Sequence, residues 1–172
     1  DRCCAIFGRP VAAELSKDYD EVWESSHTKG HRFAPSMILL PSNYSFGRLT
    51  SDEARHMLDG ARENHLTFHN NRGRGTLTPP AQVAELQVAR HLLGQGFELG
   101  LNDFASRETS SETARDSEGN KTKAVTVEVK HFSSQRTFRV HLVQSAPIEV
   151  LTSCGEPPKP QRGWKTTILE EC

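Results

Sequence analysis

The order of apolar and polar positions predicts a β-hairpin in the first half of the chain. Residues 36–40 and residues 44–49 are both rich in apolar and aromatic side chains. The turn between them, Pro41-Ser42-Asn43, is short enough to join two antiparallel strands. Apolar residues run almost without a break through residues 36–40, which is typical of a strand that is buried on both faces.

Helices are predicted on both sides of this hairpin. Before it, a short helix is expected over residues 11–15, directly after a chain break at Gly8-Arg9-Pro10. After it, Thr50 and Glu53 have the spacing of a capping box and start a helix over residues 51–63. The string Asn70-Asn71-Arg72-Gly73-Arg74-Gly75 then predicts a turn, and it contains Arg72-Gly73-Arg74-Gly75. Such a turn could hold a phosphate, but it lacks the strand–loop–helix context, so a solvated turn is favoured.

The second half of the chain predicts a helix followed by a sheet. Apolar residues at helical spacing predict the helix over residues 79–93. Residues 105–123 contain almost no apolar side chain, so a mobile surface loop is expected there. Strict alternation over residues 125–130 and 137–142 predicts a second antiparallel hairpin. Two further strands are predicted at residues 148–151 and 166–169.

Together these elements predict an α/β chain of two small units, residues 1–80 and residues 81–172. The longest uncharged apolar stretch is far shorter than the roughly 20 residues that a membrane span needs. The net charge is −1, so no overall field attracts nucleic acid or anionic lipid. Four cysteines in 172 residues are too few for a disulfide scaffold. We therefore expect neither a nucleic-acid partner nor a membrane.

Two histidines and two adjacent cysteines are candidate metal ligands. His27 and His31 form a His-x3-His pattern, which zinc proteases place on one helix face. Those enzymes need a glutamate directly after the first histidine, which is absent here, and Gly30 argues against a helix. Taken alone, surface histidines and inert thiols at Cys3 and Cys4 are the simpler interpretation. Mixed Cys/His ligation is nevertheless what imidazole-ligated iron–sulfur centres require.

A second constellation would suit a metal-dependent nuclease. Glu85 lies on a predicted helix, and Glu128 and Lys130 form a Glu-x-Lys pattern on a predicted strand. In such enzymes carboxylates hold Mg²⁺ and a lysine steadies the attacking water. The aspartate that should enter the same sheet is missing, because Asp116 and Glu118 lie in the polar segment. A solvent-exposed strand face is the favoured interpretation.

Four short blocks of residues carry a resemblance to a known family. They are residues 2–10 (Arg-Cys-Cys-Ala-Ile-Phe-Gly-Arg-Pro), 22–27 (Val-Trp-Glu-Ser-Ser-His), 30–35 (Gly-His-Arg-Phe-Ala-Pro) and 44–49 (Tyr-Ser-Phe-Gly-Arg-Leu). In this order they resemble the sucrase/ferredoxin-like family, whose relatives include the fungal actin-patch-distal proteins. The resemblance runs from Asp1 to about Arg90 and resumes weakly at Ser153-Cys154-Gly155.

The resemblance implies a thioredoxin-like ferredoxin fold that carries a [2Fe–2S] cluster. The family pattern has a first cysteine, eight further residues, a second cysteine three residues after an aspartate, and then His-x3-His. Asp1 matches the aspartate of this pattern and Cys4 matches its second cysteine. His27 and His31 match its two histidines. Cys4, His27 and His31 are therefore the expected iron ligands. The fourth ligand is expected upstream of Asp1.

The same resemblance implies that the chain is the C-terminal part of a longer protein. Residues 1–80 would be a thioredoxin-like ferredoxin domain that lacks its first strand, and residues 81–172 a small α+β extension. The chain by itself would then be one ligand short. Cys3 could replace that ligand only in a strained geometry, and Cys154 only if the tail folds back.

The expected function is electron transfer with a redox partner protein in the cytoplasm, rather than catalysis. Two alternatives from other classes remain open. One is the Mg²⁺-dependent nuclease built on Glu85, Glu128 and Lys130. The other is a thioredoxin-like binding domain without a cluster.

Overall fold

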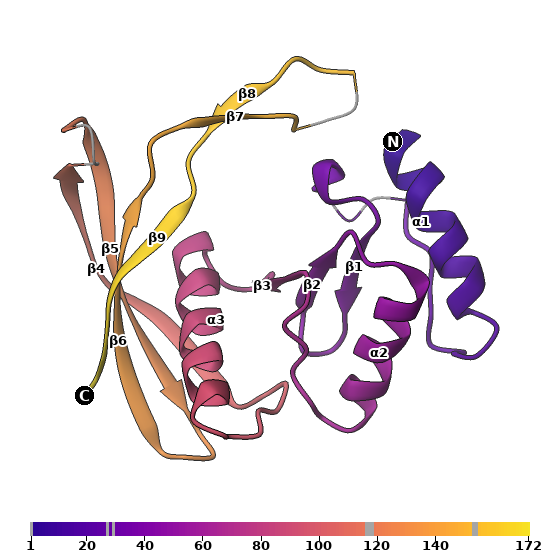
Figure 1. Cartoon of the computed structure of the whole chain (residues 1–172), viewed down its shortest axis with the longest axis horizontal. Coiled ribbons are helices and arrows are strands. Elements are labelled where there is room, and N and C mark those ends of the chain that lie inside the picture. The colour runs from indigo at the N-terminus through magenta and orange to yellow at the C-terminus, as the bar shows by residue number, and fades with distance from the viewer. Residues whose placement is uncertain (1, 27, 29, 116–118, 153–154) are drawn as a thin grey trace.

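The computed structural model describes residues 2–26, 28, 30–115, 119–152 and 155–172. Its strands form antiparallel sheets that are flanked by helices (Figure 1). In chain order the elements are α1 (Arg2–Leu15), the 3-10 helix η1 (His31–Phe33), β1 (Ser36–Leu39), β2 (Tyr44–Gly47), α2 (Ser51–Arg62), β3 (Asn71–Arg74), α3 (Pro79–Gly94), β4 (Phe104–Arg115), β5 (Lys121–His131), β6 (Arg136–Gln144), β7 (Ile148–Val150), β8 (Lys159–Gln161) and β9 (Trp164–Glu171).

The strands group into sheets with the orders β1-β2-β3, β4-β5-β6-β9 and β7-β8. In Figure 1 the four-stranded sheet curves along α3, whereas α1 and α2 lie with the three-stranded sheet. The antiparallel strands β7 and β8, with their flanking residues (residues 148–152 and 155–161), project as an arm (Figure 1). This mixed structure agrees with the predicted α/β class, and the thioredoxin-like ferredoxin fold stays a prediction. No helix in the part of the chain that the structure describes is long and apolar enough to cross a membrane.

Local signals in the first half produce the predicted hairpin and helix. β1 pairs antiparallel with β2, with Leu39 opposite Tyr44. The Thr50 hydroxyl accepts a hydrogen bond from the Glu53 N–H at 3.3 Å, and the Glu53 carboxylate accepts one from the Thr50 N–H at 2.7 Å. The capping box predicted at the start of α2 is therefore confirmed.

The core lies around α3, which packs against β3 and the four-stranded sheet. Val125, Val127 and Val129 of β5 are buried toward it, as their alternation predicts. The buried residues form one cluster, from Leu15 of α1 to Leu142 of β6. The predicted division at residue 80 falls at the first turn of α3 and stays a prediction.

The predicted chain break at Gly8-Arg9-Pro10 is wrong, because α1 already begins at Arg2. Pro10 lies inside the helix and cannot donate a hydrogen bond to the carbonyl of Ile6. Both residues are exposed, so water can solvate that carbonyl. The consequence is that Cys4 lies on the first turn of a helix.

The turn predicted over residues 70–75 is also wrong, because residues 71–74 form β3, which pairs with β2. Gly73 has a φ of 87° and lies against Gln82 of α3, where a Cβ would be 2.7 Å from the Gln82 Cβ. Glycine therefore lets the strand bend closely past the helix. Its neighbour Arg74 turns into the interior rather than into solvent.

The mobile loop predicted over residues 105–123 is wrong as well. β4 fills residues 104–115, and β5 begins at Lys121. Most of β4 is exposed because it is an edge strand that pairs with β5 alone. Its polar composition therefore reflects exposure at a sheet edge rather than disorder.

A buried ion pair joins the three-stranded sheet to α3 and β4. The carboxylate of Glu85 is fully buried and pairs with the Arg74 guanidinium, whose Nε donates to it at 2.8 Å. The Tyr44 hydroxyl and the Ser106 hydroxyl donate to the same carboxylate at 3.1 Å and 2.7 Å. Arg74 also donates to the Phe104 carbonyl at 3.0 Å. Burial and the Glu85 charge raise the pKa of Tyr44, so its hydroxyl remains a donor.

We predict that Arg74→Met lowers the free energy of unfolding by about 3–5 kcal/mol, because it leaves the Glu85 charge buried without its partner. The control is Arg107→Met, which removes an exposed pair with Glu128 and should cost less than about 1 kcal/mol. Urea unfolding measures both losses. The double variant Arg74→Met/Glu85→Leu should recover part of the stability that Arg74→Met loses. Equal losses for Arg74→Met and Arg107→Met would contradict the prediction.

Candidate functional site

Two of the three predicted iron ligands lie side by side. Cys4 is on the first turn of α1, and His31 opens η1. The Cys4 Sγ lies 3.4 Å from the His31 Nδ1, and both residues are partly exposed. The third predicted ligand, His27, lies outside the described residues. The fold thus brings a thiol and an imidazole together at a position that solvent can reach.

Close packing against β2 fixes the loop that carries His31. A Cβ added to Gly47 would lie 2.7 Å from the Phe33 Cβ and 2.9 Å from the Phe33 carbonyl oxygen. The Arg48 N–H donates to the carbonyls of Phe33 and Pro35 at 2.9 Å and 2.7 Å. The last residue of η1 and the segment after it are therefore hydrogen-bonded to Arg48, directly after β2, which restrains the position of His31.

Three arginines surround the ring of Phe33. The guanidinium carbons of Arg72, Arg32 and Arg48 lie 3.8, 4.6 and 5.8 Å from the ring centroid. Arg48 also donates from Nε and Nη2 to the Arg32 carbonyl, at 3.2 Å and 3.0 Å. Burial, and then the charge of Arg32, lower the pKa of Arg72. Since η1 contains both Phe33 and His31, positive charge collects beside the candidate site.

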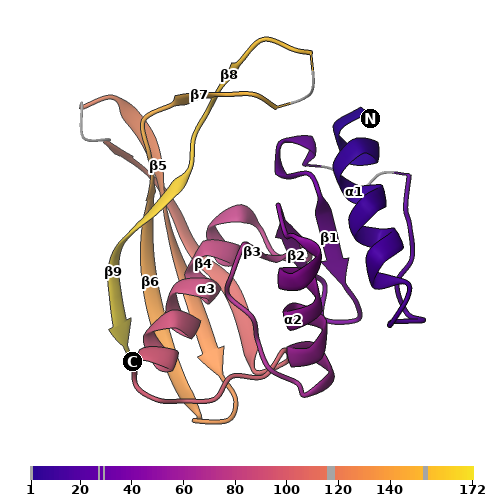
Figure 2. The ribbon, with the colours of Figure 1, turned by 45° about the vertical axis from the view of Figure 1, so that its right-hand side comes forward.

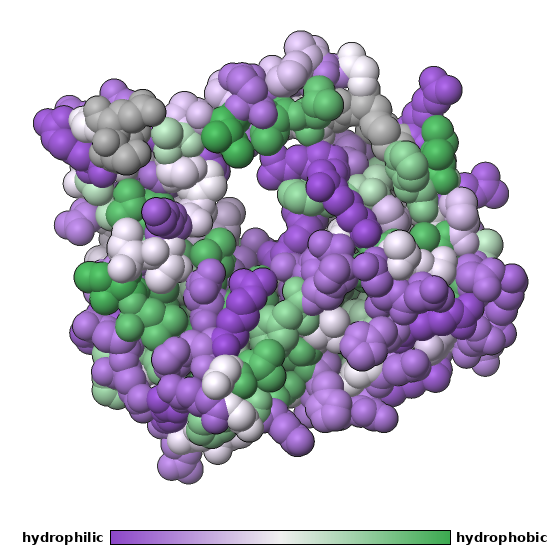
Figure 3. All heavy atoms as spheres, in the orientation of Figure 1, coloured by the Kyte–Doolittle hydropathy of each residue, from purple (hydrophilic) through white to green (hydrophobic). Residues whose placement is uncertain are grey.

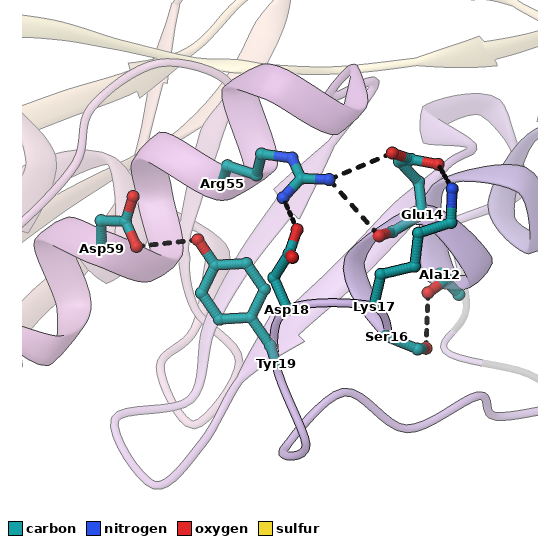
Figure 4. Close-up of polar contacts among 8 residues, drawn as sticks. All are labelled: Ala12, Glu14, Ser16, Lys17, Asp18, Tyr19, Arg55 and Asp59. Carbon is teal, nitrogen blue, oxygen red and sulfur yellow. Dashed lines mark hydrogen bonds and ion pairs between the residues drawn. The ribbon is translucent and has the colours of Figure 1, made fainter.

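Polar contacts with α2 hold the helix that carries Cys4 (Figure 4). Arg55 of α2 pairs with Asp18, and its Nη2 donates to the Glu14 carboxylate at 3.2 Å. The Tyr19 hydroxyl donates to Asp59 at 2.7 Å, a bond that raises the pKa of Tyr19. These contacts cluster at the C-terminal end of α1 and just beyond it, whereas Cys4 lies at the other end.

The arm extends from the four-stranded sheet toward the N-terminal end of α1 (Figures 1 and 2). The hydrogen bond and charge of Lys159 lower the pKa of Glu156, and the charge of His31 contributes further. Figure 3 shows open space between the arm and the rest of the molecule. Cys154, two residues before Glu156 in the sequence, lies outside the described residues.

The described residues do not contain a complete metal site. Among them, no group of three or more histidine, cysteine, aspartate or glutamate side chains is placed to hold a metal ion. Cys4 and His31 form a pair, and Cys172 is an exposed free thiol at the end of β9. A third protein ligand beside Cys4 and His31 would therefore come from outside the described residues, as His27 does.

The structure does not bring the nuclease constellation together. Glu85 is buried against the α3 face of the four-stranded sheet, where it accepts a hydrogen bond from Ser106. Glu128 and Lys130 alternate with the buried valines of β5 and therefore lie on the opposite face. Glu128 pairs with Arg107 there. Glu128 and Lys130 therefore lie on the outer face of the strand, as the favoured interpretation expects. The carboxylate of Glu85 instead forms the buried ion pair with Arg74.

Sequence reasoning missed the arginines around Phe33. Arg32 and Arg48 lie within two of the blocks that carry the family resemblance, Gly-His-Arg-Phe-Ala-Pro and Tyr-Ser-Phe-Gly-Arg-Leu. Their place within these blocks is the sequence feature that could have identified Arg32 and Arg48 as site residues. The local sequence predicts a solvated turn at Arg72, because it contains no sign that β3 places Arg72 over Phe33 of η1.

Comparison with known proteins gives one match. The family model described as sucrase/ferredoxin-like matches residues 1–75, which contain Cys4, His31 and the three arginines. No significant match was found among the curated proteins or among the solved structures.

We predict that Gly47→Ala destabilises the protein and displaces the η1 loop. The new methyl group would meet the Cβ and the backbone of Phe33 rather than a flexible side-chain end, so a loss of about 1–3 kcal/mol is expected. Gly94→Ala is the matched control, because a Cβ at that position meets nothing within 4 Å. Urea unfolding compares the two variants, and equal stabilities would show that the close approach at Gly47 does not matter.

Proposed function

Since the sucrase/ferredoxin-like family model matches residues 1–75, we propose that this chain is an electron-transfer iron–sulfur protein. Cys4, His27 and His31 would be ligands of a [2Fe–2S] cluster. The observation that carries the proposal is the 3.4 Å separation between the Cys4 Sγ and the His31 Nδ1. Thiolate and imidazole together are the donor set of mixed-ligand iron–sulfur centres.

The residues that are present fit such a group in their chemistry. Thiolate and imidazole are soft and borderline ligands that suit iron–sulfur clusters, whereas carboxylates suit harder cations. His31 turns its Nδ1 toward Cys4, so this nitrogen is the expected ligand atom. The partial exposure of both residues keeps the site accessible to another protein.

The protein environment supplies orientation and charge. The bonds from Arg48 to the η1 loop hold His31 in place before any ligand binds, which reduces the ordering cost of binding. The bound cluster would supply one-electron redox chemistry. Positive charge from Arg32 and Arg72 would favour the more negative, reduced form, and only a neutral imidazole of His31 can act as a ligand.

The remaining thiolate has two possible sources that an experiment separates. One is a cysteine upstream of Asp1, as the family pattern implies. The other is Cys154, which lies between β7 and β8 in the sequence, and these two strands extend toward the N-terminal end of α1 (Figures 1 and 2). If a cluster forms in the 172-residue chain and is lost in Cys154→Ser, the remaining thiolate ligand is Cys154. A cluster that forms only when the upstream segment is added would assign the upstream cysteine.

We predict that anaerobic loading with iron and sulfide, in whichever of these two forms is competent, gives absorption bands between about 400 and 600 nm. Cys4→Ser should abolish the bands, since one iron loses its thiolate. Cys172→Ser, at the exposed C-terminal end, is the matched control and should keep them. His31→Cys should keep the cluster and lower its reduction potential, because thiolate stabilises Fe(III) more than imidazole does.

Two results would count against this function. One is a colourless protein in both forms after loading. The other is a cluster that forms equally well in Cys4→Ser and Cys172→Ser. If the bands depend on Cys3 and not on Cys4, the assignment of the family pattern to this sequence is displaced by one residue.

A further inference from the structure

The arginines around Phe33 form a concentrated positive surface. Arg72, Arg32 and Arg48 place their guanidinium carbons 3.8, 4.6 and 5.8 Å from a single ring centroid. The ring partly offsets their repulsion through its negative face. We refer to Arg32, Arg48, Arg72 and Phe33 as the arginine cluster.

Among the described residues, no carboxylate forms an ion pair with any of the three arginines of the arginine cluster. Elsewhere in the first half of the chain, Arg55 pairs with Glu14 and Asp18, and Arg62 pairs with Glu21. The whole chain is close to neutral, with a net charge of −1, so the positive charge here is local.

Arg48 is held in a backbone conformation that glycine adopts more easily. Its φ is 60°, in the left-handed region where a side chain carries an energetic cost. Glycine could make the same backbone bonds to Phe33 and Pro35. What arginine adds is its guanidinium group, which donates to the Arg32 carbonyl. Strain of this kind is typical of positions that are kept for function.

The arginine cluster borders the proposed redox site. Arg32 directly follows His31, and the Arg72 Nη1 would lie 3.1 Å from a Cβ added to Gly30, the residue before His31. Arg32 and Arg48 are exposed, and Arg72 is partly buried. The charges of Arg32 and Arg72 therefore lie beside His31, on a surface that solvent reaches.

An apolar residue is exposed beside the same site. Phe7, about one turn after Cys4 on α1, is 54% exposed, whereas Ile6, which is 53% exposed, lies on another face of the helix. Figure 3 shows hydrophobic residues at the surface where α1 lies. Arginine and large apolar side chains together are typical of protein–protein contact surfaces. A small anion would use the charges but not the apolar residues.

We propose that the arginine cluster is the docking surface for carboxylates of an acidic protein partner, which exchanges electrons at the adjacent Cys4–His31 site. The electron-transfer part rests on the proposed function, and the docking part does not. Guanidinium groups bind carboxylates in a bidentate manner. Opposite charge at the contact would speed association and orient the partner over His31.

Binding of an acidic probe tests the docking surface without a cluster. The probe is a hexaglutamate peptide, titrated into the ¹⁵N-labelled chain at low salt and followed by NMR. We expect shifts at residues 30–35, 48 and 72, and weaker binding when salt is added, because exposed charge pairs are screened. Arg32→Gln/Arg72→Gln should weaken binding by about tenfold.

The controls keep the charge change equal. Arg107→Gln/Arg115→Gln removes two exposed arginines from β4 and should leave the peptide affinity within about twofold of the original. Arg48→Gly keeps the left-handed turn accessible, so its fold should survive and its peptide affinity should fall. Hexalysine should not bind at the arginine cluster.

Three outcomes would overturn the docking proposal: equal peptide affinity in the two double variants, no shift near Phe33, or inorganic phosphate binding there more tightly than hexaglutamate. The last would assign a small-anion site instead. None of these outcomes depends on iron. Failure of the docking surface is therefore distinguishable from failure of the proposed function, which the absorption spectrum decides.

Discussion

Burial of the Glu85 carboxylate constrains how the two larger sheets meet. An isolated buried charge costs several kcal/mol, so all of its partners have to be in place together. Those partners come from different elements: Arg74 from β3, Tyr44 from β2 and Ser106 from β4. The ion pair thereby fixes β3 between β2 and α3. β3 also carries Arg72, whose guanidinium lies over Phe33 in the loop of His31. The interior of the protein and its candidate site share this one strand.

The two halves of the candidate site are held with different strength. His31 lies on a loop that is bonded to the end of β2 and packed against Gly47. Cys4 lies at the exposed end of α1, and the ion pairs of that helix with α2 are at its other end. Exposed pairs contribute about 1 kcal/mol or less each. The imidazole is therefore preorganised, while the thiol can adjust to what binds between them.

Sequence reasoning succeeded where structure is decided locally. The capping box at Thr50 and the short turn before Tyr44 depend on neighbouring residues, and both elements form as predicted. Sequence reasoning failed where the structure of a segment depends on pairing with residues that are distant in the sequence. Residues 104–115 contain few apolar side chains, yet backbone bonds to β5 make them a strand. Arg74 belongs to a predicted surface turn, but Glu85, eleven residues later, draws it into the interior. In both cases the deciding partner is outside the local sequence window.

The candidate site shows the same limit. Cys4 and His31 are 27 residues apart, and no spacing rule joins them. Their pairing was expected from the family resemblance alone, and the structure places them together. The arginine cluster was not foreseen, because Arg32, Arg48 and Arg72 come from three separate segments. Only the fold shows that they share the ring of Phe33.

Pulsed electron–nuclear double resonance on the reduced, iron- and sulfide-loaded protein, labelled with ¹⁵N-histidine, tests the central claim most directly. A reduced [2Fe–2S] cluster is paramagnetic, and a histidine bonded to it shows strong coupling to its nitrogen. The account predicts strongly coupled ¹⁵N from imidazole, with one nitrogen coupling missing in His31→Cys. A paramagnetic cluster without coupled histidine nitrogen, or the same couplings in His31→Cys as in the parent protein, would contradict it.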